Sequence, residues 1–116
     1  MQERETVAYK SLEFAVRVVK LYSYLSEQKQ EYVMSKQLLR SGTSIGANIR
    51  EGTYGQSRKD FINKMSIALK ETAETEYWIE LLYRTEHLTT EQYESIQKDC
   101  KELARMLTAI VCNTKR

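Results

Sequence analysis

The sequence predicts an all-α protein, an antiparallel up-down-up-down four-helix bundle formed as a single domain over residues 1–116. Three observations support this prediction. The chain has no proline, and its four glycines all fall between residues 42 and 55, so helices elsewhere meet few of the usual breakers. Apolar residues recur at intervals of three and four in four successive segments. At 116 residues the chain is long enough for one hydrophobic core and too short for two.

The first segment predicts a helix over about residues 7–26. Its apolar residues form one wide stripe at helical spacing, in which Leu12, Ala15, Val16 and Val19 stand beside Phe14, Val18, Leu21 and Leu25. The polar stretch that follows, residues 26–31, contains neither glycine nor proline. The end of this helix is therefore predicted from the change of pattern alone.

The second helix is predicted over about residues 32–53. An advance of about 100° per residue places its apolar residues and two glycines on one side, which we expect to face the core: Leu38, Leu39, Gly42, Ile45, Gly46 and Ile49. A glycine inside a helix costs roughly 1 kcal/mol relative to alanine. Gly42 and Gly46, about one turn apart, therefore predict that another backbone packs very close. The alternative is a break in the helix over residues 41–44.

Capping signals separate the remaining two helices. Gly52 and Gly55 tolerate positive φ and are expected to end the second helix. Ser57 with Asp60 resembles a capping box for a third helix over about 57–86, and Thr89 with Gln92 repeats that signature before a fourth helix over about 90–113. The predicted apolar face of the third helix consists of Phe61, Met65, Ala68, Thr72, Ile79 and Leu82, widened by Ile62 and Leu69. That of the fourth helix consists of Tyr93, Ile96, Cys100, Leu103, Leu107 and Ile110.

The residue patterns of catalytic and metal-binding bundles are missing from the sequence. A di-iron bundle needs Glu-x-x-His on each of two helices, but the single histidine, His87, has Arg84 three positions before it. We expect His87 to be a solvated loop residue rather than a ligand, and Cys100, in line with Ile96 and Leu103, to be a core residue rather than a nucleophile. The glycines lack the Gly-Lys-Ser/Thr ending of a phosphate loop. No enzyme activity, metal or cofactor is expected.

The sequence also predicts a cytoplasmic protein with no membrane partner. Residues 1–10 contain no apolar signal segment, and no later stretch approaches the ~18 uncharged apolar residues of a membrane span. Cys100 and Cys112 lie about 18 Å apart along one predicted helix at ~1.5 Å per residue, beyond the ~7 Å that a disulfide spans. Free thiols suit a reducing compartment.

Positive charge is concentrated around the second predicted helix. Seven bases and two acids lie between residues 36 and 70, a net charge of +5 against +2 for the whole chain. Within roughly 80° on the helical wheel, opposite the apolar face, lie Lys36, Arg40, Ala47, Arg50 and Tyr54. They form a basic stripe that ends in an aromatic ring. This stripe, with Arg58 and Lys59 beyond it, would bind nucleic-acid phosphates, and Tyr54 is available to stack on an unpaired base. The alternatives are a solvated face, or bases that pair with acids of a neighbouring subunit.

A band of mostly uncharged polar residues separates this stripe from the core. Its members are Gln37, Ser41, Ser44, Asn48 and Glu51. Fully exposed helix faces usually carry more charge, so we expect these side chains to form hydrogen bonds with another helix, either within the bundle or across an oligomer interface.

The run from Gln37 to Gly52 closely resembles the signature of the bacterial four-helix bundle protein family, which includes proteins encoded in intervening sequences of large-subunit ribosomal RNA genes. The resemblance implies an up-down bundle that assembles into a ring-shaped homopentamer. It also implies a fold shared with the accessory variability determinant proteins of diversity-generating retroelements, which bind nucleic acid and a reverse transcriptase. Many members have a proline in the first inter-helix loop, so this proline-free chain is expected to differ there. Further matches are Ser57-x-x-Asp60-Phe61, Ile67-Ala-Leu-Lys-Glu71, Tyr77-Trp-Ile-Glu-Leu-Leu82 and Phe14-Ala15.

These observations predict a non-catalytic homo-oligomer, pentameric by resemblance, that serves as an accessory protein and binds RNA or DNA. The expected nucleic-acid ligands are Lys36, Arg40, Arg50, Tyr54, Arg58 and Lys59. The alternative is a protein-interaction scaffold, in which the basic face docks an acidic partner protein and no nucleic acid binds.

Overall fold

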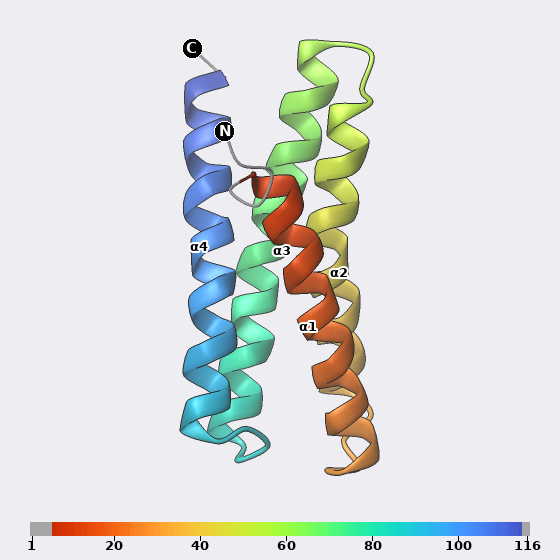
Figure 1. Cartoon of the computed structure of the whole chain (residues 1–116), viewed down its shortest axis with the longest axis vertical. Helices are drawn as coiled ribbons and strands as arrows, with labels where there is room; N and C mark the ends of the chain where they lie inside the picture. The colour runs from red at the N-terminus through yellow and green to blue at the C-terminus, as the bar shows by residue number, and fades with distance from the viewer. Residues whose placement is uncertain (1–5, 115–116) are drawn as a thin grey trace.

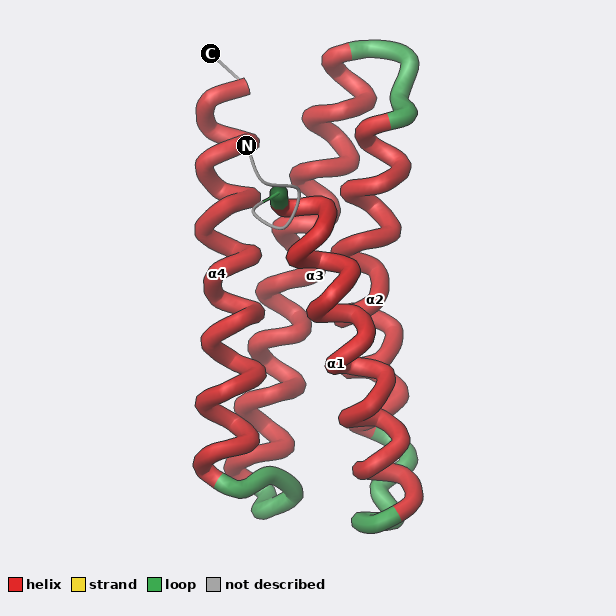
Figure 2. The backbone as a smooth tube through the Cα atoms, in the orientation of Figure 1, coloured by secondary structure: helices red, strands yellow, loops and turns green. Residues whose placement is uncertain are grey.

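The computed structural model, which describes residues 6–114, confirms the four-helix bundle. Its helices are α1 (Val7–Glu27), α2 (Met34–Thr53), α3 (Arg58–Arg84) and α4 (Thr90–Thr114). Figure 1 shows the four helices side by side, and Figure 2 shows the short turns that connect them. Each helix contacts the next one in the chain, and α4 also contacts α1, so the helices stand at the corners of a square. None of the described helices is long and apolar enough to cross a membrane.

Both predicted capping signatures are confirmed. Ser57 Oγ accepts a hydrogen bond from the backbone N–H of Asp60 at 3.1 Å. At the start of α4, the Thr89 N–H donates to Gln92 Oε1 at 2.9 Å, while the Gln92 N–H donates to Thr89 Oγ1 at 3.1 Å. These bonds satisfy backbone donors that a helix N-terminus otherwise leaves unpaired.

The expectation that Gly52 and Gly55 provide positive φ is wrong. No glycine in the described part of the chain has positive φ, whereas Gln30 (φ 55°) and Glu86 (φ 66°) do. Gly52 instead provides space, because an added Cβ would come within 2.8 Å of the Met65 methyl group on α3. Gly55 is similarly close to the first turn of α3. Both glycines therefore allow α3 to approach α2.

The predicted close helix contact at Gly42 and Gly46 is confirmed, and the partner is α1. Helix α2 runs through both glycines without a break. An added Cβ at Gly42 would lie 2.8 Å from Val18 Cγ2, and one at Gly46 would lie 3.2 Å from Ser11 Oγ. Gly42 therefore lets the branched Val18 side chain pack directly on the α2 backbone.

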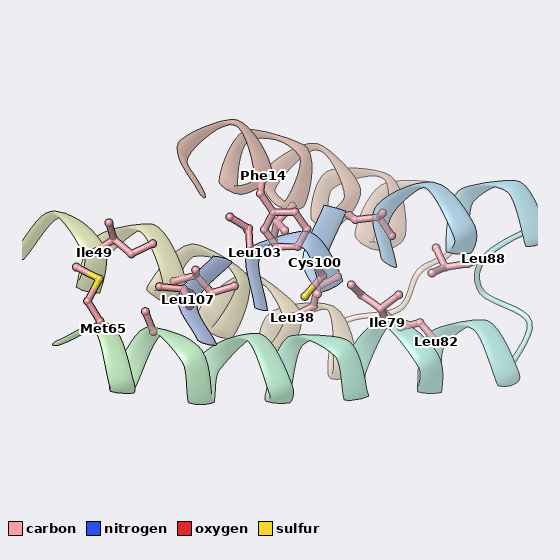
Figure 3. Packing of buried hydrophobic residues seen from close by; sticks show 14 of the residues in the cluster. Phe14, Leu38, Ile49, Met65, Ile79, Leu82, Leu88, Cys100, Leu103 and Leu107 are labelled. Carbon is pink, nitrogen blue, oxygen red and sulfur yellow. The ribbon is translucent and has the colours of Figure 1, made fainter. Parts of the chain in front are cut away.

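Only part of the wide apolar stripe predicted for α1 belongs to the core. The residues of this stripe that point inward and are buried are Phe14, Val18 and Leu25. Figure 3 shows Phe14 among the packed side chains of the other helices. By contrast, Leu12, Val16 and Val19 are 49%, 43% and 46% exposed. Their spacing of four and three residues places them together on an outward face of α1.

The turn between α1 and α2 is stabilised by Glu31. Its carboxylate accepts hydrogen bonds from the backbone N–H groups of Val33 (3.0 Å), Met34 (3.0 Å) and Ser35 (2.7 Å) at the start of α2. Burial would raise the pKa of Glu31, but these backbone hydrogen bonds together hold that pKa below its ordinary value. A charged side chain thus caps α2 in a turn that contains no proline.

We expect Glu31→Ala to lower the free energy of unfolding by about 1–2 kcal/mol, because three backbone donors lose their partner. Since the pKa is lower in the folded state, the charged cap stabilises the fold above the ordinary pKa of 4.5 and loses this effect as the pH falls below it. The difference in urea midpoint between wild type and Glu31→Ala should therefore shrink in acid. Glu27→Ala, at the exposed end of α1, is the control, and a difference that grew in acid would contradict the assignment.

Candidate nucleic-acid interface

The predicted basic residues of α2 and the following turn are all exposed, but the structure divides them. Arg50, Tyr54, Arg58 and Lys59 lie at the α2–α3 turn, which projects at one end of the bundle (Figure 1). Tyr54 is 82% exposed. Lys36 lies near the opposite end of α2, about 21 Å from Arg50 along the helix at ~1.5 Å per residue. We call the four residues at the turn the α2–α3 basic end.

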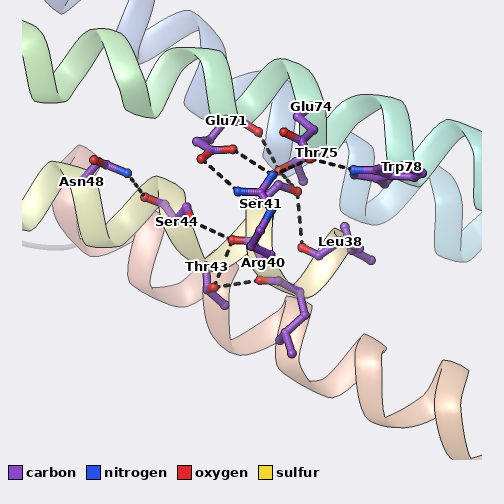
Figure 4. A network of polar contacts seen from close by, with 11 residues as sticks. Leu38, Arg40, Ser41, Thr43, Ser44, Asn48, Glu71, Glu74, Thr75 and Trp78 are labelled. Carbon is purple, nitrogen blue, oxygen red and sulfur yellow. Dashed lines mark hydrogen bonds and ion pairs between the residues drawn. The ribbon is translucent and has the colours of Figure 1, made fainter. Parts of the chain in front are cut away.

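Arg40 is neutralised within the bundle. Its Nη1 forms a 3.2 Å ion pair with Glu71 Oε2, and its Nη2 forms an ion pair with Glu74. Figure 4 shows that Glu74 also accepts a hydrogen bond from the Trp78 indole N–H, at 3.0 Å. The hydrogen bond with Glu74 is the main cause that raises the pKa of Arg40, and the same bond lowers the pKa of Glu74. With two acids for one base, this cluster does not attract phosphate.

Lys36, Arg50, Lys59 and Lys70 form no ion pair with any acid among residues 6–114. Lys70 belongs to the basic stretch of the sequence but lay outside the predicted stripe, because the wheel of α2 says nothing about α3. The free positive charge of this region therefore extends onto the outer side of α3.

Two members of the polar band contact α3. The buried Ser41 Oγ accepts a hydrogen bond from Thr75 Oγ1 at 2.9 Å, and Glu51 forms a 2.8 Å ion pair with Lys64. These contacts lie within the bundle, which was one of the two predicted alternatives. Of the other members, Gln37 is exposed, and Ser44 and Asn48 donate to backbone carbonyl groups of α2 itself.

A groove between α1 and α2 adjoins the basic end. Its walls are mainly apolar, and Arg50 and Tyr54 lie at one end of it. The lining residues on the two helices include Ala8, Leu12, Ala15, Thr43 and Ala47. The sequence pattern did not indicate this groove, because Leu12 falls in the apolar stripe predicted to face the core.

In the part of the chain that the structure describes, no three His, Cys, Asp or Glu residues lie close enough to hold a metal ion. Cys100 is buried as predicted, and burial, with the nearby Glu76 carboxylate, raises the pKa of its thiol to about 12. His87 Nδ1 forms a 2.9 Å hydrogen bond with Thr85 Oγ1 in the α3–α4 turn.

Comparisons with known proteins agree with the resemblance seen in the sequence. Residues 3–109 match the model of the family described as 23S rRNA-intervening sequence protein. A crystal structure of a protein with unknown function from the S23 ribosomal protein family of Bacteroides thetaiotaomicron VPI-5482 is 63% identical, with a TM-score of 0.90 over 91% of this chain and 98% of that chain. No curated protein matches the chain. The family predicted from the Gln37–Gly52 run is thus confirmed, and the chain belongs to the 23S rRNA-intervening sequence protein family.

Proposed function

We propose that this protein is a non-catalytic, homo-oligomeric accessory protein that binds RNA or DNA through the α2–α3 basic end. The observation that carries the proposal is the exposed Tyr54 ring, which lines the groove together with Arg50, at a turn that also carries the exposed Lys59. Such a surface attracts phosphates and offers a stacking surface to an unpaired base. The family description, which refers to intervening sequences of 23S rRNA, supports a connection with ribosomal RNA.

The set of ligands that we propose is smaller than the set predicted from the sequence. Arg50, Tyr54, Arg58 and Lys59 fall within ten consecutive residues at the α2–α3 turn, and we assign them to the same bound strand. Lys36 lies too far along α2 to join them on the same few nucleotides, and Arg40 is occupied by two acids. The role we propose for the basic end therefore does not involve Arg40.

The test is a binding titration with a fluorescent 20-nucleotide RNA and DNA at low salt. We expect Arg50→Glu/Lys59→Glu to weaken binding at least tenfold and to reduce the slope of log affinity against log salt by about 1.5, because each lost phosphate contact reduces it by ~0.7–0.9. The control Lys20→Glu/Lys29→Glu changes the net charge equally, at exposed positions away from the α2–α3 turn. Arg40→Gln should leave affinity unchanged. Equal affinity of wild type and Arg50→Glu/Lys59→Glu would refute the proposal.

A protein-interaction scaffold is the second candidate, favoured by the exposed Leu12, Val16 and Val19 on α1. The two functions differ in which macromolecule the protein binds. A scaffold would bind an acidic partner protein at the basic face and would bind neither RNA nor DNA in the titration above.

A further inference from the structure

Tyr54 lines two hollows of the surface. One is the groove between α1 and α2, and the other, here called the turn hollow, lies between the end of α2 and the first turns of α3. The turn hollow has a volume of about 520 Å³, within the ~300–1,000 Å³ of sites that take small molecules. The exposed Tyr54 ring therefore forms one wall of a site with room for a nucleobase. The lining residues are Glu51, Tyr54, Gly55, Gln56, Asp60, Asn63, Lys64 and Ile67.

Two carboxylates are held in place at the turn hollow. Asp60 Oδ2 accepts a hydrogen bond from the backbone N–H of Gln56 at 3.3 Å, and the Asp60 N–H donates to Ser57 Oγ at 3.1 Å. Glu51 Oε1 forms a 2.8 Å ion pair with Lys64 Nζ. Among residues 6–114, Asp60 Oδ1 and Glu51 Oε2 have no hydrogen-bond or ion-pair partner. Each carboxylate therefore still offers an acceptor oxygen to a ligand.

The base that suits these groups has two neighbouring N–H donors on one edge. Stacking on the Tyr54 ring selects no base, because every base has a π-face. Carboxylate oxygens accept hydrogen bonds and do not donate them. Guanine presents two adjacent donor groups on its Watson–Crick edge, the N1–H and the 2-amino group, whereas adenine, cytosine and uracil each present one. Unpaired bases are commonly recognised by this edge, and hydrogen bonds to a charged acceptor are the stronger kind.

The two acids do not cancel the attraction of the turn for phosphates. Residues 50–64 contain four bases and two acids. Lys64 offsets Glu51 in the ion pair, and Lys59, next to Asp60 in the chain, is exposed. Phosphates of a strand can thus bind the cations of the turn while the edge of one base faces the carboxylates.

We propose that the turn hollow binds a guanine of a single strand, with the face of the base on Tyr54 and its N1–H and 2-amino group donating to Asp60 and Glu51. The inference rests on the proposed nucleic-acid function and names the base that the site prefers. Asn63 also lines the hollow, and its amide N–H offers a donor to the guanine O6 oxygen. Free GMP contains the same base but lacks the neighbouring phosphates, so it should bind much more weakly than a strand.

The test is a binding titration at low salt with fluorescent ten-nucleotide RNAs of uracil that carry one central guanine, hypoxanthine, 2-aminopurine or adenine. We expect the guanine strand to bind at least about fivefold more tightly than the adenine strand, the lower end for a good two-bond base contact. Hypoxanthine keeps the N1–H and lacks the 2-amino group, whereas 2-aminopurine keeps the amino group and lacks the N1–H. Both strands should therefore bind with intermediate affinity.

Asp60→Asn and Glu51→Gln keep the shape of each side chain but replace one carboxylate oxygen by an N–H donor. Each variant should reduce the preference for guanine over adenine to about twofold or less. Neither should weaken binding of the adenine strand, because the loss of a negative charge does not repel phosphates. The control is Glu94→Gln, which removes one charge at an exposed position near the start of α4 and should keep the wild-type preference.

The possible failures are distinguishable. Equal affinity for the guanine and adenine strands, or a guanine preference that survives in both Asp60→Asn and Glu51→Gln, would overturn the guanine site and leave the α2–α3 basic end as proposed. Free GMP that displaces the guanine strand at equal concentration would overturn the assignment to a strand. A wild type that binds none of the strands would overturn the nucleic-acid function itself.

Discussion

Phe14→Ala is expected to lower the free energy of unfolding by about 3–5 kcal/mol, whereas Leu12→Ala is expected to change it by no more than about 0.5 kcal/mol. The two residues are neighbours in the predicted apolar stripe of α1. Phe14 is only 2% exposed, and its removal leaves a cavity between helices, while Leu12 is 49% exposed. The contrast follows from which face of α1 is buried.

Urea unfolding, followed by circular dichroism at concentrations where the chain is monomeric, measures both values. Low concentration matters because Leu12 is exposed beside the groove between α1 and α2, where a loss of the proposed assembly would otherwise add to the apparent change. A large loss for Leu12→Ala in the monomer, equal to that for Phe14→Ala, would show that α1 is rotated relative to the structure described here.

Gly42→Val is expected to destabilise the protein by about 3 kcal/mol, near the upper end for overpacked cores. Even a single added Cβ would lie 2.8 Å and 2.9 Å from the two Val18 methyl groups. A β-branched side chain in a helix is stiff, so neither residue relieves the clash by rotation. To fit the new side chain, α1 must move away from α2.

Ala47→Val is the matched control for this substitution, because Ala47 lies on the same helix and is exposed. Ala47→Val should lower the free energy of unfolding only by the difference in helix propensity between alanine and valine, roughly 0.5 kcal/mol. Adding Val18→Ala to Gly42→Val removes the clashing methyl groups, so the double variant should lose less stability than the sum of the two single losses. Full additivity, measured by urea unfolding, would contradict the contact between Gly42 and Val18.

Local sequence signals predicted the helices, the N-terminal caps of α3 and α4 and the close approach at Gly42 well, but not the way in which α2 ends. These features depend on residues a few positions apart, or on the unusual presence of glycine inside a helix. The capping pairs Ser57 with Asp60 and Thr89 with Gln92 are of this kind. Such signals are readable in a single chain because the interactions that they form lie within one or two turns.

The features that the sequence did not predict depend on which helices are neighbours in the bundle. The wheel of α1 is apolar over both its inner and its outer side, so it does not show that Phe14 is buried and Val16 is not. Arg40 is free on the wheel of α2, and its neutralisation depends on the position of Glu71 and Glu74 on α3. Lys70 was not placed in the predicted basic stripe for the same reason, because it lies on α3 and not on α2.

The two cysteines have different surroundings, so the protein can be labelled for spectroscopy at one of them alone. Cys100 is buried and its thiol has a pKa of about 12, so it does not react at neutral pH, whereas Cys112 is exposed near the end of α4. That end of α4 and the α2–α3 turn lie at the same end of the bundle (Figure 1). A maleimide dye would therefore label the unmodified chain once, at the end of the bundle that carries the α2–α3 basic end.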